Sequence, residues 1–272
     1  MRPSFRLRAG PWESALRGAV GVLLAVTLWD VAVRFAWIDP LLLPTPWQVF
    51  AQFWRGWTVP SIGQSKLLAA SLATLGHFGL GFGLAILIGV SVGAILAMTP
   101  RMRDYMNATV RLFQYTPPAA LLPLLILYFD RGRLTIALYI VFGSAWPILI
   151  HTRDALSSRD QTLIAAARNL GWKGRQLFLH ILLPASVSEI LSGIRVSSSI
   201  ALITTIVAEF LAGEAGLGFE ILLAQRTFEY RSMYSGIVCL AIIGLAMNCG
   251  LMLAERYFTR WRTSGDLLSI VE

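Results

Sequence analysis

Charged residues are scarce in this sequence. Asp, Glu, Lys and Arg make up 14% of its 272 residues, whereas 56% are hydrophobic and the mean hydropathy is +0.65. This composition is typical of a membrane protein rather than a soluble domain. The formal net charge is +8, but the basic residues lie between hydrophobic runs and form no stripe interleaved with aromatics. The pattern therefore favours membrane orientation and contact with lipid headgroups over nucleic-acid binding.

Residues with catalytic or metal-binding chemistry are also few. The two cysteines, Cys239 and Cys249, are separated by about 15 Å along one predicted helix, which is too far for a disulfide within it. The histidines His77, His151 and His180 are scattered without metal-ligand spacing. No G-x-x-x-x-G-K-[ST] phosphate loop is present, so this chain has no nucleotide-binding site of that kind. We expect a chain with no metal, cofactor or catalytic residue of its own.

Six hydrophobic runs approach or exceed the length that a membrane-crossing helix needs, which is roughly 20 residues. The predicted fold is therefore all-α, with six transmembrane helices. Most Lys and Arg residues then fall on the side that holds both termini, as expected when that side is cytoplasmic. We expect a multi-pass protein of the bacterial plasma (inner) membrane with both termini inside. The runs cover about residues 18–36, 71–99, 111–129, 134–151, 190–212 and 233–257.

The predicted spans divide the chain into three parts. Arginines precede the first run as in a signal peptide, but the run is longer than usual and no small-residue cleavage site follows it, so we expect a retained span. Residues 1–17 are predicted to be a cytoplasmic segment, 18–257 the transmembrane domain and 258–272 a cytoplasmic tail. The proline- and tryptophan-containing stretch 37–66 is predicted to be an outer interfacial loop.

Prolines and polar side chains inside two spans are candidates for a translocation path. Pro117 and Pro118 lack backbone donors and should break or kink the third span, which is tolerated at membrane depth only against protein or water. Arg195 opens a run of hydroxyl side chains in the fifth span. These hydroxyls can instead bond to their own helix, and arginine can reach the inner headgroups. The candidate path residues are Pro117, Pro118, Arg195, Ser198, Ser199 and Thr204.

Other features of the spans have structural interpretations. Asp30 and Arg34 are one helical turn apart and are predicted to form an ion pair. Gly89 and Gly93 match the small-residue pattern of close helix packing, with a flexible gate as the alternative. Glu209, near the outer end of the fifth span, is open to three roles: reaching the interface, bonding within the fold or contacting the solute.

Residues 152–189 are amphipathic rather than hydrophobic. Leu163, Ala166, Ala167 and Leu170 repeat at helical spacing, and Gly171 stands where a C-cap ends a helix. A second short helix is predicted from about residue 172, ending at a proline thirteen residues after the glycine. The product is a helix–turn–helix on the cytoplasmic side. It can dock on a partner protein or lie on the inner leaflet.

At this segment the sequence resembles a known family. The residues Ala165-Ala166-Ala167, then Gly171, then Ile181-Leu182-Leu183-Pro184 match the spacing of the EAA signature of ABC importer permeases, with Ala165 in place of the signature Glu. The similarity extends to the nitrate/sulfonate/taurine branch over nearly the whole chain. It is carried by Leu43-Pro44-Thr45-Pro46, Pro118 to Pro123, Gly193-Ile194-Arg195, Ala208-Glu209 and Gly216-Leu217-Gly218.

The resemblance implies a function and partners. It implies the permease subunit of an ATP-driven importer for a small anion such as nitrate, a sulfonate or taurine. It also implies a second permease copy, two ATPase subunits and an extracytoplasmic solute-binding protein. An ion-gradient-driven transporter is the alternative, although no inverted repeat with paired broken helices is visible. The predicted ATPase-coupling residues are Ala165, Ala166, Ala167, Leu170, Gly171, Trp172, Ile181, Leu183 and Pro184.

Overall fold

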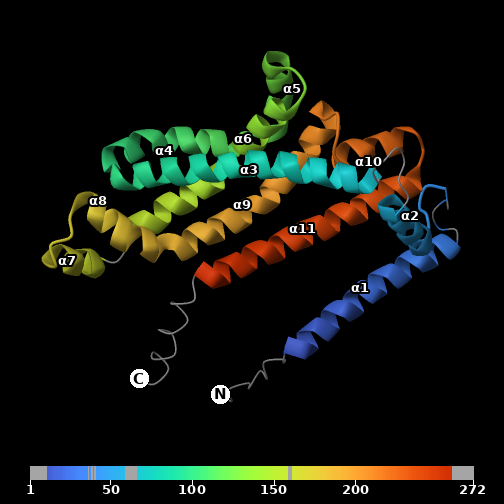
Figure 1. Ribbon diagram of the computed structural model, residues 1–272, viewed down its shortest axis with the longest axis horizontal. Helices are drawn as coiled ribbons and strands as arrows, with labels where there is room; N and C mark the ends of the chain where they lie inside the picture. Colours follow the sequence, from blue (N-terminus) through green and yellow to red (C-terminus); the bar gives the residue numbers. More distant parts are fainter. Residues whose placement is uncertain are drawn as a thin grey trace.

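The computed structural model of the protein describes residues 11–35, 37, 39, 41–58, 66–158 and 161–258. Throughout these ranges the regular structure is helical, which confirms the predicted all-α fold (Figure 1). The ends of the predicted terminal segments, residues 1–10 and 259–272, lie outside the described residues. The helices are α1 (Pro11–Arg34), α2 (Pro46–Thr58), α3 (Lys66–Met98), α4 (Pro100–Tyr115), α5 (Pro118–Phe129), α6 (Arg133–Ser157), α7 (Gln161–Asn169), α8 (Gly174–Leu177), the π-helical turn η1 (Phe178–Leu182), α9 (Leu183–Ala212), α10 (Leu217–Arg226) and α11 (Tyr230–Phe258).

Five stretches of the described chain are long and hydrophobic enough to cross a bilayer as single helices. They are Leu16–Arg34, Lys66–Met98, Arg133–Ser157, Gly174–Ala212 and Tyr230–Phe258. The predicted third span, 111–129, is wrong as one helix, because α4 and α5 meet at an angle of 90°. The count is six only if this bent pair is one span.

The bend between α4 and α5 follows from two consecutive prolines. A proline forces the residue before it out of the helical region and towards extended backbone. Thr116 and Pro117 each precede a proline, and both have ψ 121°. Two successive extended residues turn the chain, and α5 then starts at Pro118, where the missing N–H is tolerated. The predicted break is confirmed.

Three long helices, α3, α6 and α9, form the centre of the bundle. Ile140 and Ile148 of α6 and Ala201 of α9 are fully buried in one hydrophobic cluster with side chains of α3. A Cβ at Gly89 or Gly93 of α3 would lie 2.6–2.8 Å from atoms of α6. These two glycines therefore allow close approach of the helices, as their spacing predicts.

The stretch 37–66, predicted to be an outer interfacial loop, differs from that expectation. The predicted interfacial loop contains the amphipathic helix α2, with Val49 buried and Trp47 and Trp54 exposed. The expectation of a loop is wrong because the turn residues are confined to the segment before Pro46, and a helix-compatible sequence follows. On α1, the predicted Arg34–Asp30 ion pair is confirmed, with 2.6 Å between Nε and Oδ2.

The fifth span begins much earlier than residue 190. Helix runs from Gly174 through Pro184 to Ala212, so the prediction that Pro184 interrupts the second coupling helix is wrong. The reason is the π-helical turn η1, in which the Leu183 N–H donates to the Phe178 carbonyl, five residues earlier. This wider turn accommodates a residue that has no N–H and a bulky ring.

Candidate functional site

The hairpin formed by α7 and α8 lies at one end of the molecule, and α2 and α10 lie at the opposite end (Figure 1). α7 ends in a Schellman motif: the Gly171 N–H donates to Arg168 O at 3.0 Å, and the Trp172 N–H donates to Ala167 O at 3.1 Å. Gly171 has φ +89°, a conformation that residues with a Cβ rarely adopt. The predicted glycine C-cap is confirmed.

The hairpin places hydrophobic and basic side chains in solvent. Leu170, next to the cap, is 79% exposed. Ala165 and Ala166 are exposed and Ala167 is buried, while the Trp172 ring lies 5.1 Å from the His180 ring. An exposed leucine at the tip of a projection, beside the exposed Arg168, Lys173 and Arg175, is the kind of surface that a protein partner covers.

The base of the hairpin is continuous with the membrane bundle. Ile181 and Leu183 are half-buried and Pro184 is exposed where η1 passes into α9. Ser186 of α9 donates to Ala155 O of α6 at 3.1 Å, which ties together the two helices that enter and leave the hairpin. α8 therefore continues directly into α9, which is bonded to α6.

The candidate path residues do not form one cluster. A Cβ at Gly143 of α6 would lie 2.6 Å from Thr204 and 3.6 Å from Pro118, so both of these residues approach α6 at Gly143. Pro117 is exposed beside them. Ser199 is exposed and lines a hollow of about 240 Å³ between α9 and α11.

Arg195 and the hydroxyl groups of α9 have partners within the protein. Arg195 Nη1 lies 2.8 Å from Glu255 Oε2, an ion pair between α9 and α11 that the sequence did not predict. Ser198 donates to Arg195 O at 2.7 Å and Thr204 donates to Ile200 O at 3.0 Å, so these hydroxyls bond back to their own helix. A role in solute passage for these three residues stays a prediction.

Glu209 is the centre of a polar network that the sequence indicated only in part. Its side chain is fully buried. Its carboxylate accepts hydrogen bonds from Thr74 Oγ1 at 3.0 Å and from the Gly218 N–H at 2.9 Å, and it lies 2.9 Å from His77 Nδ1. Of the three roles left open for Glu209, the structure shows the hydrogen bond within the fold. The i, i+3 spacing of Thr74 and His77 puts both on one face of α3. Nothing in the sequence indicates that Glu209 is their common partner.

The same network holds the first turn of α10. The Leu217 N–H donates to Thr74 Oγ1 at 2.8 Å, so two backbone donors at this helix N-terminus are satisfied by side chains of α3 and α9. A carboxylate also interacts favourably with the positive end of the helix dipole. Gly216 has φ +119°, and a Cβ there would overlap the Glu209 carboxyl group. α10 is thus fixed against the bundle core.

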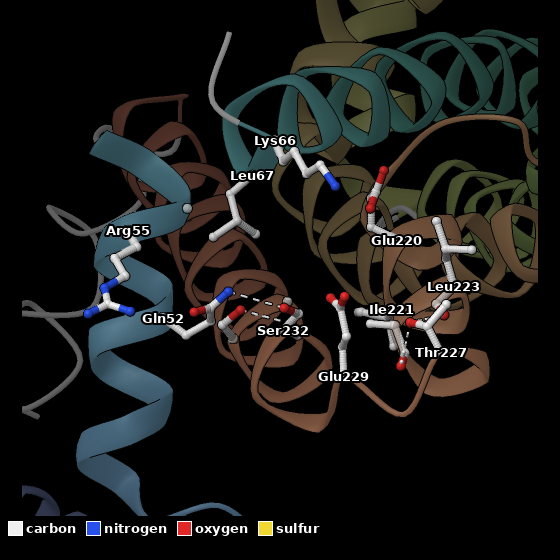
Figure 2. A pocket seen from close by; sticks show the side chains of 14 residues that line it. Gln52, Arg55, Lys66, Leu67, Glu220, Ile221, Leu223, Thr227, Glu229 and Ser232 are labelled. Carbon is white, nitrogen blue, oxygen red and sulfur yellow. Dashed lines mark hydrogen bonds between the residues drawn. The ribbon is translucent and has the colours of Figure 1, made fainter. Parts of the chain in front are cut away.

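A depression opens at this end between α2, the start of α3, α10 and the start of α11 (Figure 2). It has a volume of about 510 Å³. Figure 2 shows Lys66, Glu220 and Glu229 around it, and the Gln52 amide donating to Ser232 Oγ at 3.1 Å. A second hollow of about 400 Å³ shares Gln52, Glu229 and Ser232 with the first. The two hollows are adjacent, and together they are called the outer depression, after the side of the membrane on which the sequence predicts this end of the bundle to lie.

Residues 85–264 match the family model described as the binding-protein-dependent transport system inner membrane component. The chain belongs to this family. The match includes the hairpin and the core helices α6 and α9. It also includes α10 and α11, which line part of the outer depression. It follows that the protein is the membrane-spanning permease subunit of an ABC importer in the inner membrane, a class that works with an ATPase and a solute-binding protein.

Individual relatives agree with the family assignment. The permease is 29% identical to the taurine transport system permease protein TauC of Escherichia coli K12 over 249 residues, which is 90% of this chain and 88% of the relative. It is 28% identical to SsuC of Bacillus subtilis 168, described as an aliphatic sulfonates transport permease, over 92% of this chain and 88% of the relative. These matches favour the ATP-driven importer over the ion-gradient alternative.

Solved structures confirm the type of fold. An inward-facing form of the MetNI methionine ABC transporter aligns with a TM-score of 0.63 at 20% identity, covering 71% of this permease and 96% of that chain. A bacterial ABC transporter that imports alginate aligns with a TM-score of 0.61 at 15% identity, covering 91% and 99%. The predicted ABC importer permease fold is therefore confirmed.

Proposed function

We propose that this permease forms the translocation path of an importer for a small sulfonate or similar anion, and that the α7–α8 hairpin is the contact with its ATPase. The solute class is supported by relatives that carry taurine and aliphatic sulfonates. The observation that carries the coupling role is the Schellman-capped hairpin, which presents Leu170 to solvent and continues into α9. The permease itself catalyses no bond change, and ATP is hydrolysed by the separate subunit.

Two copies of the chain would form the path around a two-fold axis. Homodimers with closed symmetry are the commonest oligomers, and a path between copies needs only one kind of subunit. Pro118 and Thr204, which both lie beside Gly143, and the exposed Ser199 are candidates to line it. ATP-driven closure of the ATPase dimer would move the paired hairpins together and change which side of the membrane the path opens to.

Uptake in reconstituted vesicles tests this function. Vesicles that contain the permease, its ATPase and its binding protein should accumulate taurine or an alkanesulfonate when ATP is supplied to the ATPase side. Omitting ATP or the binding protein should abolish accumulation. Accumulation driven by an imposed ion gradient without ATP would contradict the proposal.

The proposed orientation places residues 1–17, 258–272 and the hairpin segment 152–189 in the cytoplasm, with 18–257 as the membrane domain. In a Cys249→Ser background, cysteine at Ser158 should react only with reagents that reach the cytoplasm, because the residue is exposed where α6 meets the hairpin. Cysteine at the exposed Glu214 should react with impermeant maleimide from outside. The buried Cys239 serves as an internal unreactive control. Reversed labelling would contradict the orientation.

A further inference from the structure

The helix α4 lies alongside α3 and α6 (Figure 1) and carries polar side chains on the face that points away from them. Val110, on the opposite face, is buried in one cluster with side chains of α3 and α6. The outward face of α4 is formed by residues that follow one another at spacings of four, three and four, and all of them are exposed. They are Asp104, Ala108, Arg111 and Tyr115.

The second half of this face lies at membrane depth. At the inner end, Arg153 Nη1 of α6 donates to Asn107 Oδ1 of α4 at 2.9 Å. One and a half turns further along α4, the Phe113 ring stacks on Trp146, with 5.5 Å between the ring centroids. Arg111 is between these two contacts, beside the part of α6 that the sequence predicts to be a span. Tyr115 is one helical turn deeper.

Arg111 and Tyr115 have polar groups that the fold does not use. Among the described residues, neither the Arg111 guanidinium nor the Tyr115 hydroxyl forms an ion pair or a hydrogen bond. Asp104 is about 10 Å from Arg111 along the helix, and the cation beside it is Arg103 at 3.8 Å. A free charge at membrane depth is costly unless it meets water or a ligand.

The outward face of α4 is unlike a surface that contacts hydrocarbon. α11 exposes Ile242, Leu245 and Leu253, as expected of a helix that faces lipid. The outward face of α4 instead leads to the exposed Pro117, where the chain bends and the candidate path residues begin. A polar helix face that ends at a broken span is typical of the wall of a water-filled path.

We propose that Arg111 and Tyr115 form a binding site for the oxyanion group of the solute in the cytoplasmic half of the translocation path. The proposal rests on the proposed function. Side chains one helical turn apart have Cβ atoms about 5–6 Å from each other, so both can contact one group. The guanidinium can donate two parallel hydrogen bonds to a sulfonate, and the Tyr115 hydroxyl can donate a third. The small Ala108, on the other side of Arg111, leaves room for the solute.

The ligand chemistry is a singly charged oxyanion on sulfur or phosphorus. The sulfonate of the solute and the phosphate of a lipid headgroup are its two sources. Headgroup sites are built from clustered cations, whereas the outward face of α4 also carries the carboxylate of Asp104, which is 73% exposed. The charges therefore favour the solute. A site on a path must also release what it binds, so we expect weak affinity.

Fluorine NMR of trifluoroethanesulfonate measures the site directly. The permease–ATPase complex in nanodiscs of zwitterionic lipid, without the binding protein, should broaden the resonance. Arg111→Gln should weaken this binding about tenfold, and Arg111→Lys less, because lysine keeps the charge but loses the planar fork. Both should keep the wild-type thermal midpoint, since Arg111 has no partner among the described residues. Arg101→Gln, at an exposed arginine about 15 Å away on the same helix, is the matched control and should bind as the wild type does. Equal broadening by the wild type and Arg111→Gln would overturn the site.

Import provides the second arm. In vesicles of zwitterionic lipid, Arg111→Gln should slow ATP-driven taurine import about tenfold and Tyr115→Phe about threefold, with the Kd for the binding protein unchanged. A defect of Arg111→Gln that appears only when phosphatidylglycerol is added would assign Arg111 to a lipid headgroup and overturn the solute role. Unchanged import and probe binding in Arg111→Gln, with import still dependent on ATP and binding protein, would overturn the site and leave the proposed function intact. Probe binding through Arg111 in a wild type that imports no sulfonate would keep the site and overturn the proposed solute class.

Discussion

Replacing Gly171 with Val should leave the permease inserted and dimeric while lowering the amount of ATPase that co-purifies with it roughly tenfold. Gly171 has φ +89°, and no heavy atom lies within 4 Å of where its Cβ would stand. The effect therefore comes from backbone strain of about 1–2 kcal/mol, which is relieved by changing the turn, and not from a clash inside the chain. A changed turn moves Leu170 and Trp172 away from the partner. Uptake driven by ATP should fall with the association.

Graded substitutions at the hairpin serve as controls. Gly171→Ala should be milder than Gly171→Val, and Gly171→Asn milder still, because asparagine tolerates left-handed backbone. Ala165→Glu should be tolerated, since Ala165 is exposed in the middle of α7 and glutamate is a good helix former. Full complex formation and full transport by Gly171→Val would remove the mechanical basis of the coupling assignment.

Glu209→Ala should destabilise the permease by about 2–4 kcal/mol and be seen as a lower thermal midpoint of the purified complex. The substitution leaves Thr74, His77 and the Gly218 N–H without their common partner in a buried site. Each unsatisfied buried group costs about 1–3 kcal/mol, and hydrogen bonds between helices in membranes are at the lower end of this range.

The Glu209 prediction has matched controls on the same segment. Glu209→Gln keeps an acceptor for Thr74 and the Gly218 N–H, so its midpoint should lie between those of the wild type and Glu209→Ala. Glu214→Ala removes an exposed carboxylate five residues away and should have no effect. A wild-type midpoint for Glu209→Ala would mean that the network adds nothing to stability.

Local signals in the sequence predicted the parts of the structure that depend on neighbouring residues. The Gly171 cap and the break after Thr116 each result from a conformational restriction that acts within a few residues, so both could be inferred correctly. The 90° angle between α4 and α5 could not, because it depends on how each helix packs on the bundle. The helix through Pro184 was missed because a π-helical turn has no clear sequence signature.

The polar network around Glu209 shows the limit of inference from one sequence. Its members come from α3, α9 and the start of α10, and the Thr74–Glu209 pair is separated by 135 positions. The sequence correctly indicated that Glu209 is a charged residue within a span and needs polar partners. Only the folded chain identifies the groups that hydrogen-bond to its carboxylate. The same holds for Arg195, whose partner Glu255 lies on another helix.

The continuous helix from Gly174 to Ala212 can tilt as one rigid rod. Its 39 residues span about 58 Å, roughly twice the thickness of the hydrocarbon layer. A tilt of about 5° around its midpoint would displace each end by about 2.5 Å, in opposite directions. The end beside the proposed ATPase contact and the end that carries Glu209 would therefore move together without any bending of the helix. In the proposed orientation, small rotations imposed at the hairpin would become ångström-scale shifts of α10 at the opposite end of the bundle.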